Sequence, residues 1–205
     1  MAVPPSHRSD LSEELLLRRQ RASAGGGRAK IDSLRASGRR TARERIDALL
    51  DESSFVEVDS LVTHRNDDFN LHMHQIEGDG VVCGHGTVDG RQIFCFAQDF
   101  SVFGGSMGEM HALKIAKIAE MAERARIPLV GIWDGGGQRA HDGIHSLAGT
   151  GELLDRLVAC SGRVPMFSLI LGPVVGVSAL AAGLADFVVL GHEHGQLFLS
   201  SPLET

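Results

Sequence analysis

Two stretches of this chain share one plan: an apolar run of strand length, then a glycine-rich turn, then a helical pattern. The first run covers residues 127–132 and leads into three consecutive glycines at 135–137. The second run covers residues 167–170 and leads into Gly172 and Gly176. Strands that alternate with helices are typical of βαβ units and a largely parallel sheet. We therefore predict an α/β fold in which the two runs are neighbouring strands.

Each glycine-rich turn is a candidate site for a negatively charged ligand group. Glycine lets the backbone turn sharply and lets a ligand approach the main chain closely. Open α/β sheets bind ligands at the carboxyl ends of their strands, and the amides of a following helix favour negative charge there. Because neighbouring parallel strands end at one edge of a sheet, we expect the turns at 135–137 and 172–179 to meet. Ordinary tight strand–helix loops are the alternative for both.

A helical arm precedes this α/β region. Residues 1–9 are expected to be unstructured, and Asp10 indicates the start of a short helix that ends before the glycines at 25–27. Thr41 and Glu44 have the spacing of a capping box, so we predict that another helix begins there.

A β-rich region and then regular strand–helix alternation follow the arm. The dipeptide Asp89-Gly90 lies between apolar runs and predicts a β-hairpin. The predicted elements are a strand at 55–58, hairpin strands at 79–88 and 91–100, a helix at 106–126, a strand at 128–133, a helix at 149–161, a strand at 166–171, a helix at 175–184, and short strands at 187–190 and 196–199.

Charge is distributed unevenly along the chain. Residues 1–50 carry 11 Lys/Arg against 6 Asp/Glu, although the whole chain has a net charge of −6. The basic arm could contact phosphate on a ligand, a nucleic acid or an acidic partner surface, and a solvated helical face is the simpler alternative. Our expectation for the whole chain is that it has no nucleic-acid partner.

The cysteines and the apolar runs exclude several classes of protein. Cys83, Cys95 and Cys160 have no metal-like spacing, so we exclude a zinc ribbon and predict no metal site. No apolar run reaches transmembrane length, and the N-terminus lacks the apolar core of a secretory signal. We therefore expect a cytoplasmic protein without a membrane partner.

A third glycine-rich segment matches the nucleophile elbow of α/β-hydrolases. Gly104, Ser106 and Gly108 fit the pattern G-x-S-x-G between a predicted strand and a predicted helix. Acids and histidines further along could complete a triad, but no particular histidine is indicated. A serine hydrolase is therefore a minor alternative, and we prefer a glycine-rich helix start with Ser106 as its N-cap.

Motifs in a fixed order carry a resemblance to a known family. They lie at 41–47, 78–82, 94–100 and 102–109, at Asp134-Gly135-Gly136-Gly137 with Arg139 and Gly143, and at 159–165 and 172–187. In this order they resemble the carboxyltransferase (β) subunit of biotin-dependent acyl-CoA carboxylases, of which propionyl-CoA carboxylase is the best-known member. The resemblance covers the chain from about residue 30 to its end.

The resemblance implies a crotonase (ClpP-like) fold, which is a β-β-α superhelix with a mostly parallel central sheet. Subunits of the family look like two such domains in tandem, and this chain resembles only the N-terminal half. It implies an N-terminal arm at 1–29 and an acyl-CoA carboxyltransferase N-terminal domain at 30–205, either truncated or encoded by a split gene. It also implies an oligomer with a C-terminal carboxyltransferase half or sister subunits, and with biotin carboxylase and biotin carrier subunits.

The implied reaction moves CO2 from carboxybiotin, held on a partner carrier protein, to the α-carbon of a short-chain acyl-CoA such as propionyl- or acetyl-CoA. Because the cofactor takes the proton, the protein has to supply main-chain amides that stabilise the thioester enolate. By resemblance, the oxyanion donors are the N–H groups of Gly136, Gly137, Gly176 and Val177. The implied substrate-binding positions are Gly104, Gly105, Gly135, Arg139 and Gly172.

The chain departs from the family pattern at the second turn. Residues 174–177 read Val-Val-Gly-Val where the family usually has Cys-Ala-Gly-Gly, and Val177 adds bulk near the implied thioester. A subunit of an acyl-CoA or malonate-type decarboxylase, which runs related chemistry in reverse, fits the same motifs. A non-catalytic partner that only scaffolds a complex is a further alternative.

Overall fold

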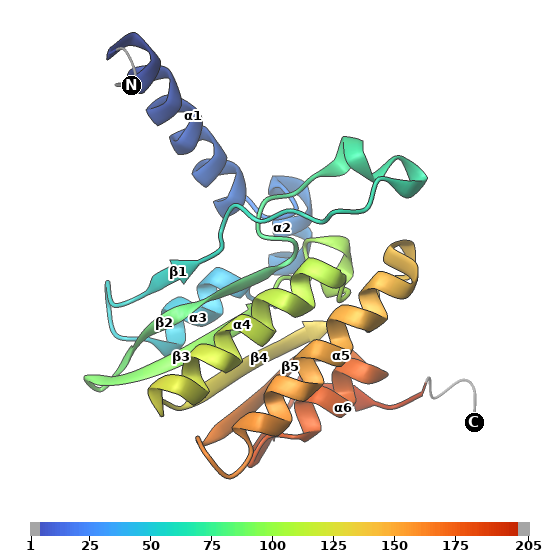
Figure 1. Ribbon diagram of the computed structural model, residues 1–205. Coiled ribbons are helices and arrows are strands. Elements are labelled where there is room, and N and C mark those ends of the chain that lie inside the picture. Colours follow the sequence, from blue (N-terminus) through green and yellow to red (C-terminus); the bar gives the residue numbers. More distant parts are fainter. Residues whose placement is uncertain (1–4, 201–205) are drawn as a thin grey trace.

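The computed structural model describes residues 5–200 and shows a seven-stranded sheet with helices on both faces (Figure 1). The strands are β1 (Val56–Val58), β2 (Val81–Val88), β3 (Arg91–Gln98), β4 (Leu129–Gly135), β5 (Met166–Val175), β6 (Phe187–Leu190) and β7 (Gln196–Phe198). Their order is β1-β2-β3-β4-β5-β6, and β7 also pairs with β5. The first three strands are antiparallel and the remaining pairs are parallel. The prediction of an α/β fold with a mostly parallel central sheet is confirmed.

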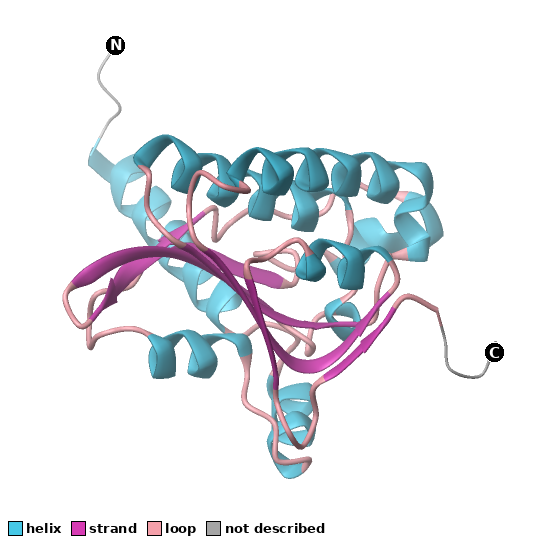
Figure 2. Cartoon of the chain, turned by 90° about the horizontal axis from the view of Figure 1, so that it is seen from below, coloured by secondary structure: helices cyan, strands magenta, loops and turns pink. Residues whose placement is uncertain are grey.

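Helices cover both faces of the twisted sheet (Figure 2). The helices within residues 5–200 are α1 (Pro5–Ser23), α2 (Arg28–Ala36), α3 (Ala42–Leu49), α4 (Glu109–Ala125), α5 (Gly143–Cys160) and α6 (Val177–Gly183), with short 3₁₀ turns at Asp68–His74, Phe103–Gly105 and Ala140–Asp142. Helices α4, α5 and α6 pack on one face, and α3 packs on the other.

Side chains along the central strands point alternately to the two faces of the sheet, and this produces the two cores. In β3, Phe94 and Phe96 pack toward α4, whereas Cys95 and Ala97 pack toward α3. Successive side chains of a strand point to opposite faces, so a strand covered on both faces is apolar at nearly every position. Burial raises the pKa of the Cys95 thiol to about 12, so this core thiol is unreactive.

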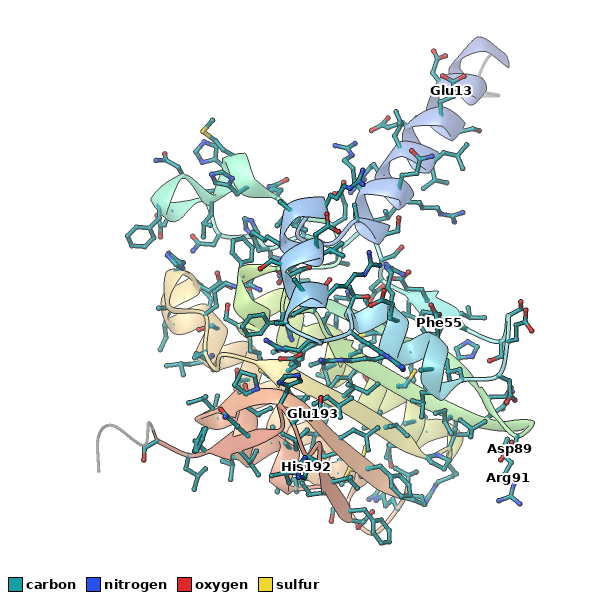
Figure 3. All side chains as sticks on the ribbon, turned by 180° about the vertical axis from the view of Figure 1, so that it is seen from behind. Glu13, Phe55, Asp89, Arg91, His192 and Glu193 are labelled. Carbon is teal, nitrogen blue, oxygen red and sulfur yellow. The ribbon has the colours of Figure 1, made fainter. Side chains whose placement is uncertain are left out.

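The register of the sheet brings the two glycine turns to one edge. Asp89 and Arg91 mark the tip of the β2–β3 hairpin in Figure 3, at one end of the sheet. Strand β3 leads away from that tip, and β4 and β5 run parallel to it. Both glycine turns therefore lie at the opposite end, where Gly135 is paired with Val174.

The arm differs in part from its prediction. Helix α1 begins at Pro5 rather than Asp10 and projects from the body of the protein (Figure 1), so the expectation of an unstructured segment is wrong for residues 5–9. Residues 1–4 of that segment lie outside the described part of the chain. Proline is readily accepted in the first turn of a helix, because an amide there has no intrahelical partner. Helix α2 was not predicted, since Leu34 is its only buried residue.

The local signals at α3 and the hairpin are confirmed, but several boundaries near the turns are not, including the start of α6 at Val177 rather than 175. Thr41 and Glu44 make both hydrogen bonds of the capping box. Helix α4 begins at Glu109 rather than 106, and α5 begins at Gly143 rather than 149. Strand β5 continues to Val175, because β4 and β7 pair with it beyond the predicted end at 171.

Within residues 5–200, none of the helices is both long and apolar enough to span a bilayer.

Candidate functional site

The two glycine turns lie against each other, as predicted. A Cβ placed on Gly137 would lie 3.1 Å from the carbonyl oxygen of Val175. Gly137 has φ +84° and Gly176 has φ +64°, a region that favours glycine. The positive φ of the second turn therefore falls on Gly176, and Val174 and Val175 remain in the strand. The departure from the family pattern at these valines does not prevent the turn from forming.

A third turn, residues 103–108, is joined to the first by main-chain hydrogen bonds. The Gly136 N–H donates to Gly104 O at 3.1 Å, and the Met107 N–H donates to Gly137 O at 2.7 Å. Gly105 and Gly135 face each other so closely that a Cβ on either would lie 2.2 Å from backbone oxygen of the other segment. Gly104, Gly105 and Gly135 thus lie beside the proposed oxyanion donors, and two of them allow the close backbone contact.

The four predicted donors differ in whether their amides are free. The Gly136 amide donates to the Gly104 carbonyl oxygen, and the Gly176 amide donates to Phe198 O at 2.8 Å. Within residues 5–200, the Gly137 and Val177 amides have no hydrogen-bond acceptor. Gly137 and Val177 are therefore the stronger candidates for oxyanion donors, because a donor has to be available to the ligand.

Arg139 is buried inside the protein rather than exposed beside a ligand. Its guanidinium donates to Asp79 Oδ1 at 2.5 Å and to the Ser106 carbonyl at 3.0 Å, and it stacks 4.7 Å from the Phe103 ring. A second carboxylate, Asp142, lies 3.8 Å away. Its contacts here hold the first turn in place by joining it to the segment before β2.

Asp134, at the start of the first turn, is the centre of a second buried ion-pair cluster, and Gly172 packs against it. Asp134 is 1% exposed and accepts from Arg39, while Arg45 Nη1 lies 2.6 Å from its other carboxylate oxygen. A Cβ on Gly172 would lie 1.9 Å from Asp134 Oδ1. Gly172 therefore provides the space that this carboxylate occupies, a packing role that its prediction as a substrate-binding residue did not include.

Sequence reasoning missed several buried polar residues that support the turns. Asp79 lies between Gly78 and Gly80 with φ +46°, and burial raises its pKa while Arg139 opposes that change. His111 and Gln98 are fully buried. The only local signal was a polar side chain inside an apolar pattern. That signal does not identify a partner.

His111 makes the stability of the protein depend on pH. Its pKa lies well below the ordinary 6.5, because burial disfavours the imidazolium and Arg139 and Lys114 add positive charge nearby. Below pH 6.5 the unfolded chain protonates this residue and the folded chain does not, so stability falls as pH falls. We expect His111 to contribute a slope approaching about 1.4 kcal/mol per pH unit. Urea unfolding between pH 7 and 5 measures it, with His111→Gln as the control. Equal slopes for the two proteins would contradict this assignment.

A cavity of about 450 Å³ opens beside the third turn. Its lining includes Gly104, Phe100 and two basic residues, Lys30 and Arg39. Arg39 also stacks 4.1 Å from the centroid of the Phe100 ring. Because Arg39 is paired with Asp134, Lys30 supplies the positive charge that this cavity can offer to a negatively charged ligand. Among the described residues, no cluster of three His, Cys, Asp or Glu side chains could hold a metal ion.

The hydrolase alternative has no support in the geometry. Ser106 donates its hydroxyl hydrogen bond to the Phe103 carbonyl at 2.8 Å, and within residues 5–200 no hydrogen bond joins it to a histidine. It is also not the N-cap of α4. That position is Gly108, and the carboxylate of Asp142 accepts from the Glu109 amide instead. Strand β3 ends at Gln98, so the sharp strand–helix elbow of the hydrolases is absent here.

Comparisons with known proteins agree over nearly the whole chain. Residues 33–203 match the model of the carboxyl transferase domain. The propionyl-CoA carboxylase beta chain of Roseobacter denitrificans is 45% identical over 94% of this chain and 38% of its own length. The methylmalonyl-CoA decarboxylase subunit alpha of Veillonella parvula is 42% identical over 87% of this chain and 35% of its own length.

A solved structure confirms the predicted fold class. The transcarboxylase 12S structure, a hexamer assembly with methylmalonyl-coenzyme A bound, matches with a TM-score of 0.92 and 35% identity. The match covers 100% of this chain and 39% of the other chain. The chain thus spans about two fifths of the length of the relatives that it matches.

Proposed function

Because the chain belongs to the carboxyl transferase domain family, we propose that it forms the acyl-CoA-binding half of a biotin-dependent carboxyltransferase. The observation that carries the proposal is the pair of free amides, Gly137 and Val177, on two turns that meet at one edge of the sheet. An enolate of an acyl-CoA thioester bears its charge on one oxygen. Two preorganised amides at such an oxygen are the arrangement that stabilises it.

The third turn and its cavity support a place for the rest of the substrate. Coenzyme A carries several phosphate charges, and Lys30 and Arg39 line the cavity that begins at Gly104. Gly104 is itself hydrogen-bonded to Gly136 of the first turn. A molecule with its phosphates near Lys30 and Arg39 can therefore extend toward the turns. The substrate class we propose is a short-chain acyl-CoA, such as propionyl- or acetyl-CoA.

The chemistry that this chain has to supply is limited. Carboxybiotin, held on a partner carrier protein, would provide CO2, and the biotin left behind would accept the proton from the α-carbon. This chain binds the thioester, orients its α-carbon and stabilises the enolate oxygen, so it needs no side-chain base at the turns. The biotin-binding surface then belongs to a C-terminal carboxyltransferase half or a sister subunit, and activity requires the assembled oligomer.

Exchange of the substrate's α-proton tests this proposal. The chain is assembled with its C-terminal half and the carboxylated biotin carrier, then incubated with propionyl-CoA in deuterium oxide. We expect biotin-dependent deuterium uptake at the α-carbon, measured by mass spectrometry, because a stabilised enolate can return to the thioester by taking a deuteron. An assembly that binds propionyl-CoA but incorporates no deuterium would favour the scaffold alternative.

The decarboxylase alternative has one observation in its favour, the match to a methylmalonyl-CoA decarboxylase subunit. The same free amides would serve it, because loss of CO2 from a malonyl-type thioester also produces an enolate. The two directions are separated by two reactions of the assembly, one with methylmalonyl-CoA and uncarboxylated biotin carrier and one with propionyl-CoA and carboxylated carrier. A faster reaction with methylmalonyl-CoA would favour a decarboxylase, and a faster reaction with propionyl-CoA would favour a carboxylase.

A further inference from the structure

A buried side-chain relay supports the amide at the start of the first glycine turn. The β3–β4 hydrogen-bonded register ends at Ala97 and Ile132, and the β4–β5 register shifts between Trp133 and Gly135. The Asp134 amide therefore falls outside the regular pairing of both strands. Because Asp134 is only 1% exposed, water cannot accept from this amide either. Such a buried donor is costly when it lacks an acceptor.

The side chain of Gln98 supplies that acceptor. Its Oε1 accepts from the Asp134 amide at 3.0 Å, and a Cβ on Gly135 would lie 3.0 Å from the same oxygen. The other end of the carboxamide, Nε2, lies 3.2 Å from Nε2 of His111. Since Oε1 accepts from an amide, the nitrogen of Gln98 has to donate to His111, and the ring nitrogen there has to be unprotonated.

The remaining ring nitrogen of His111 completes the chain of bonds. Nδ1 lies 3.1 Å from the carbonyl oxygen of Asp79, which can only accept. His111 is fully buried and its pKa is lowered, so the ring is neutral and carries its one proton on Nδ1. The two ends of the relay fix the direction of every hydrogen bond in it, because the Asp134 amide can only donate and the Asp79 carbonyl can only accept.

Asp79 also holds the far end of the same turn. Its carboxylate binds Arg139, which follows the three glycines, and its other oxygen accepts from the His111 main-chain amide at 2.9 Å. The first turn is thus fixed at both ends from one residue, through Arg139 after the glycines and through His111 and Gln98 before them.

We propose that Gln98 and His111 are positioning residues that hold the glycine turn 135–137 in the geometry needed for its free amide to meet the enolate oxygen. This inference rests on the proposed function for its effect on the reaction, but not for the relay itself. Neither side chain contacts the site directly; each acts through the Asp134 amide.

Two neutral substitutions of His111 separate positioning from core packing. Gln in place of His111 puts an oxygen near the position of Nε2, so it can still accept from Gln98. Asn is shorter, so its side chain can still reach the Asp79 carbonyl but cannot reach Gln98. In the assembled enzyme we expect His111→Asn to lower the turnover number of α-proton exchange by up to roughly a hundredfold, as for a reacting group displaced by about 1 Å. KM should change little, and His111→Gln should restore most of the turnover.

Nuclear magnetic resonance of the chain tests the relay without any activity. In the wild type, long-range nitrogen–proton correlations should show a protonated Nδ1 and an unprotonated Nε2 for His111. In Gln98→Met, the Asp134 amide should exchange faster with solvent because its acceptor is gone. The opposite tautomer, or an unchanged Asp134 amide in Gln98→Met, would overturn the relay.

Equal loss of turnover in His111→Asn and His111→Gln would overturn the positioning role and leave His111 as a core residue. If the wild-type assembly shows no α-proton exchange, the proposed function fails instead, and the His111 and Asp134 resonances still decide whether the relay exists.

Discussion

Replacing Asp134 by asparagine should lower the free energy of unfolding by about 3–5 kcal/mol, the cost of breaking a buried ion pair by removing one partner. The change is nearly isosteric, so it alters charge rather than packing. Arg45 has a side chain that is 5% exposed and Arg39 one that is 12% exposed, and both rely on this carboxylate. Without it, two guanidinium groups remain out of water with no counter-ion.

Chemical unfolding in urea measures this loss, and an exposed ion pair of α5 provides a matched control. Glu152 pairs with Arg156 one helical turn away at the surface. Glu152→Gln makes the same change from carboxylate to amide, and we expect no measurable change in stability because exposed pairs contribute little. Equal effects of the two substitutions would show that Asp134 does not stabilise the fold through buried charge.

Val177→Pro should lower the turnover of the assembled enzyme by about a hundred- to a thousandfold, the cost of removing one oxyanion donor. Val177 is the first residue of α6, and its amide has no hydrogen-bond acceptor within residues 5–200. Proline suits the first position of a helix, since that amide has no intrahelical partner to lose. The substitution therefore deletes the proposed donor at small cost to the fold.

Val177→Ala is the control, because it removes the same branched side chain and keeps the amide. We expect it to retain turnover near the wild-type level, while KM for propionyl-CoA stays similar in both variants. Deuterium uptake at the α-carbon gives the turnover, and thermal unfolding verifies that both variants are folded. If proline and alanine reduce turnover equally, the Val177 amide is not an oxyanion donor.

Local chemistry explains why some elements were predictable. The capping box at Thr41 and the Asp89-Gly90 turn involve residues close in sequence, so their bonds can be read without the fold. The meeting of the two glycine turns was also predictable, because adjacent parallel strands end at one edge. The errors arose where distant partners decide. Gly172 and Pro173 are usual strand breakers, yet pairing with β4 and β7 keeps them in β5.

The sequence by itself determined the α/β class, the order of the motifs and the position of both glycine turns, because apolar periodicity and glycine act over a few residues. Only the tertiary structure decided which amides are free. The Gly136 amide donates to the Gly104 carbonyl, and the Gly176 amide donates to the Phe198 carbonyl. The amides of Gly137 and Val177 have no such acceptor within residues 5–200. Only the fold could also pair Arg139 with Asp79, 60 positions away. A buried charge takes whichever partner the packing brings to it, and that choice has no local signature in the chain.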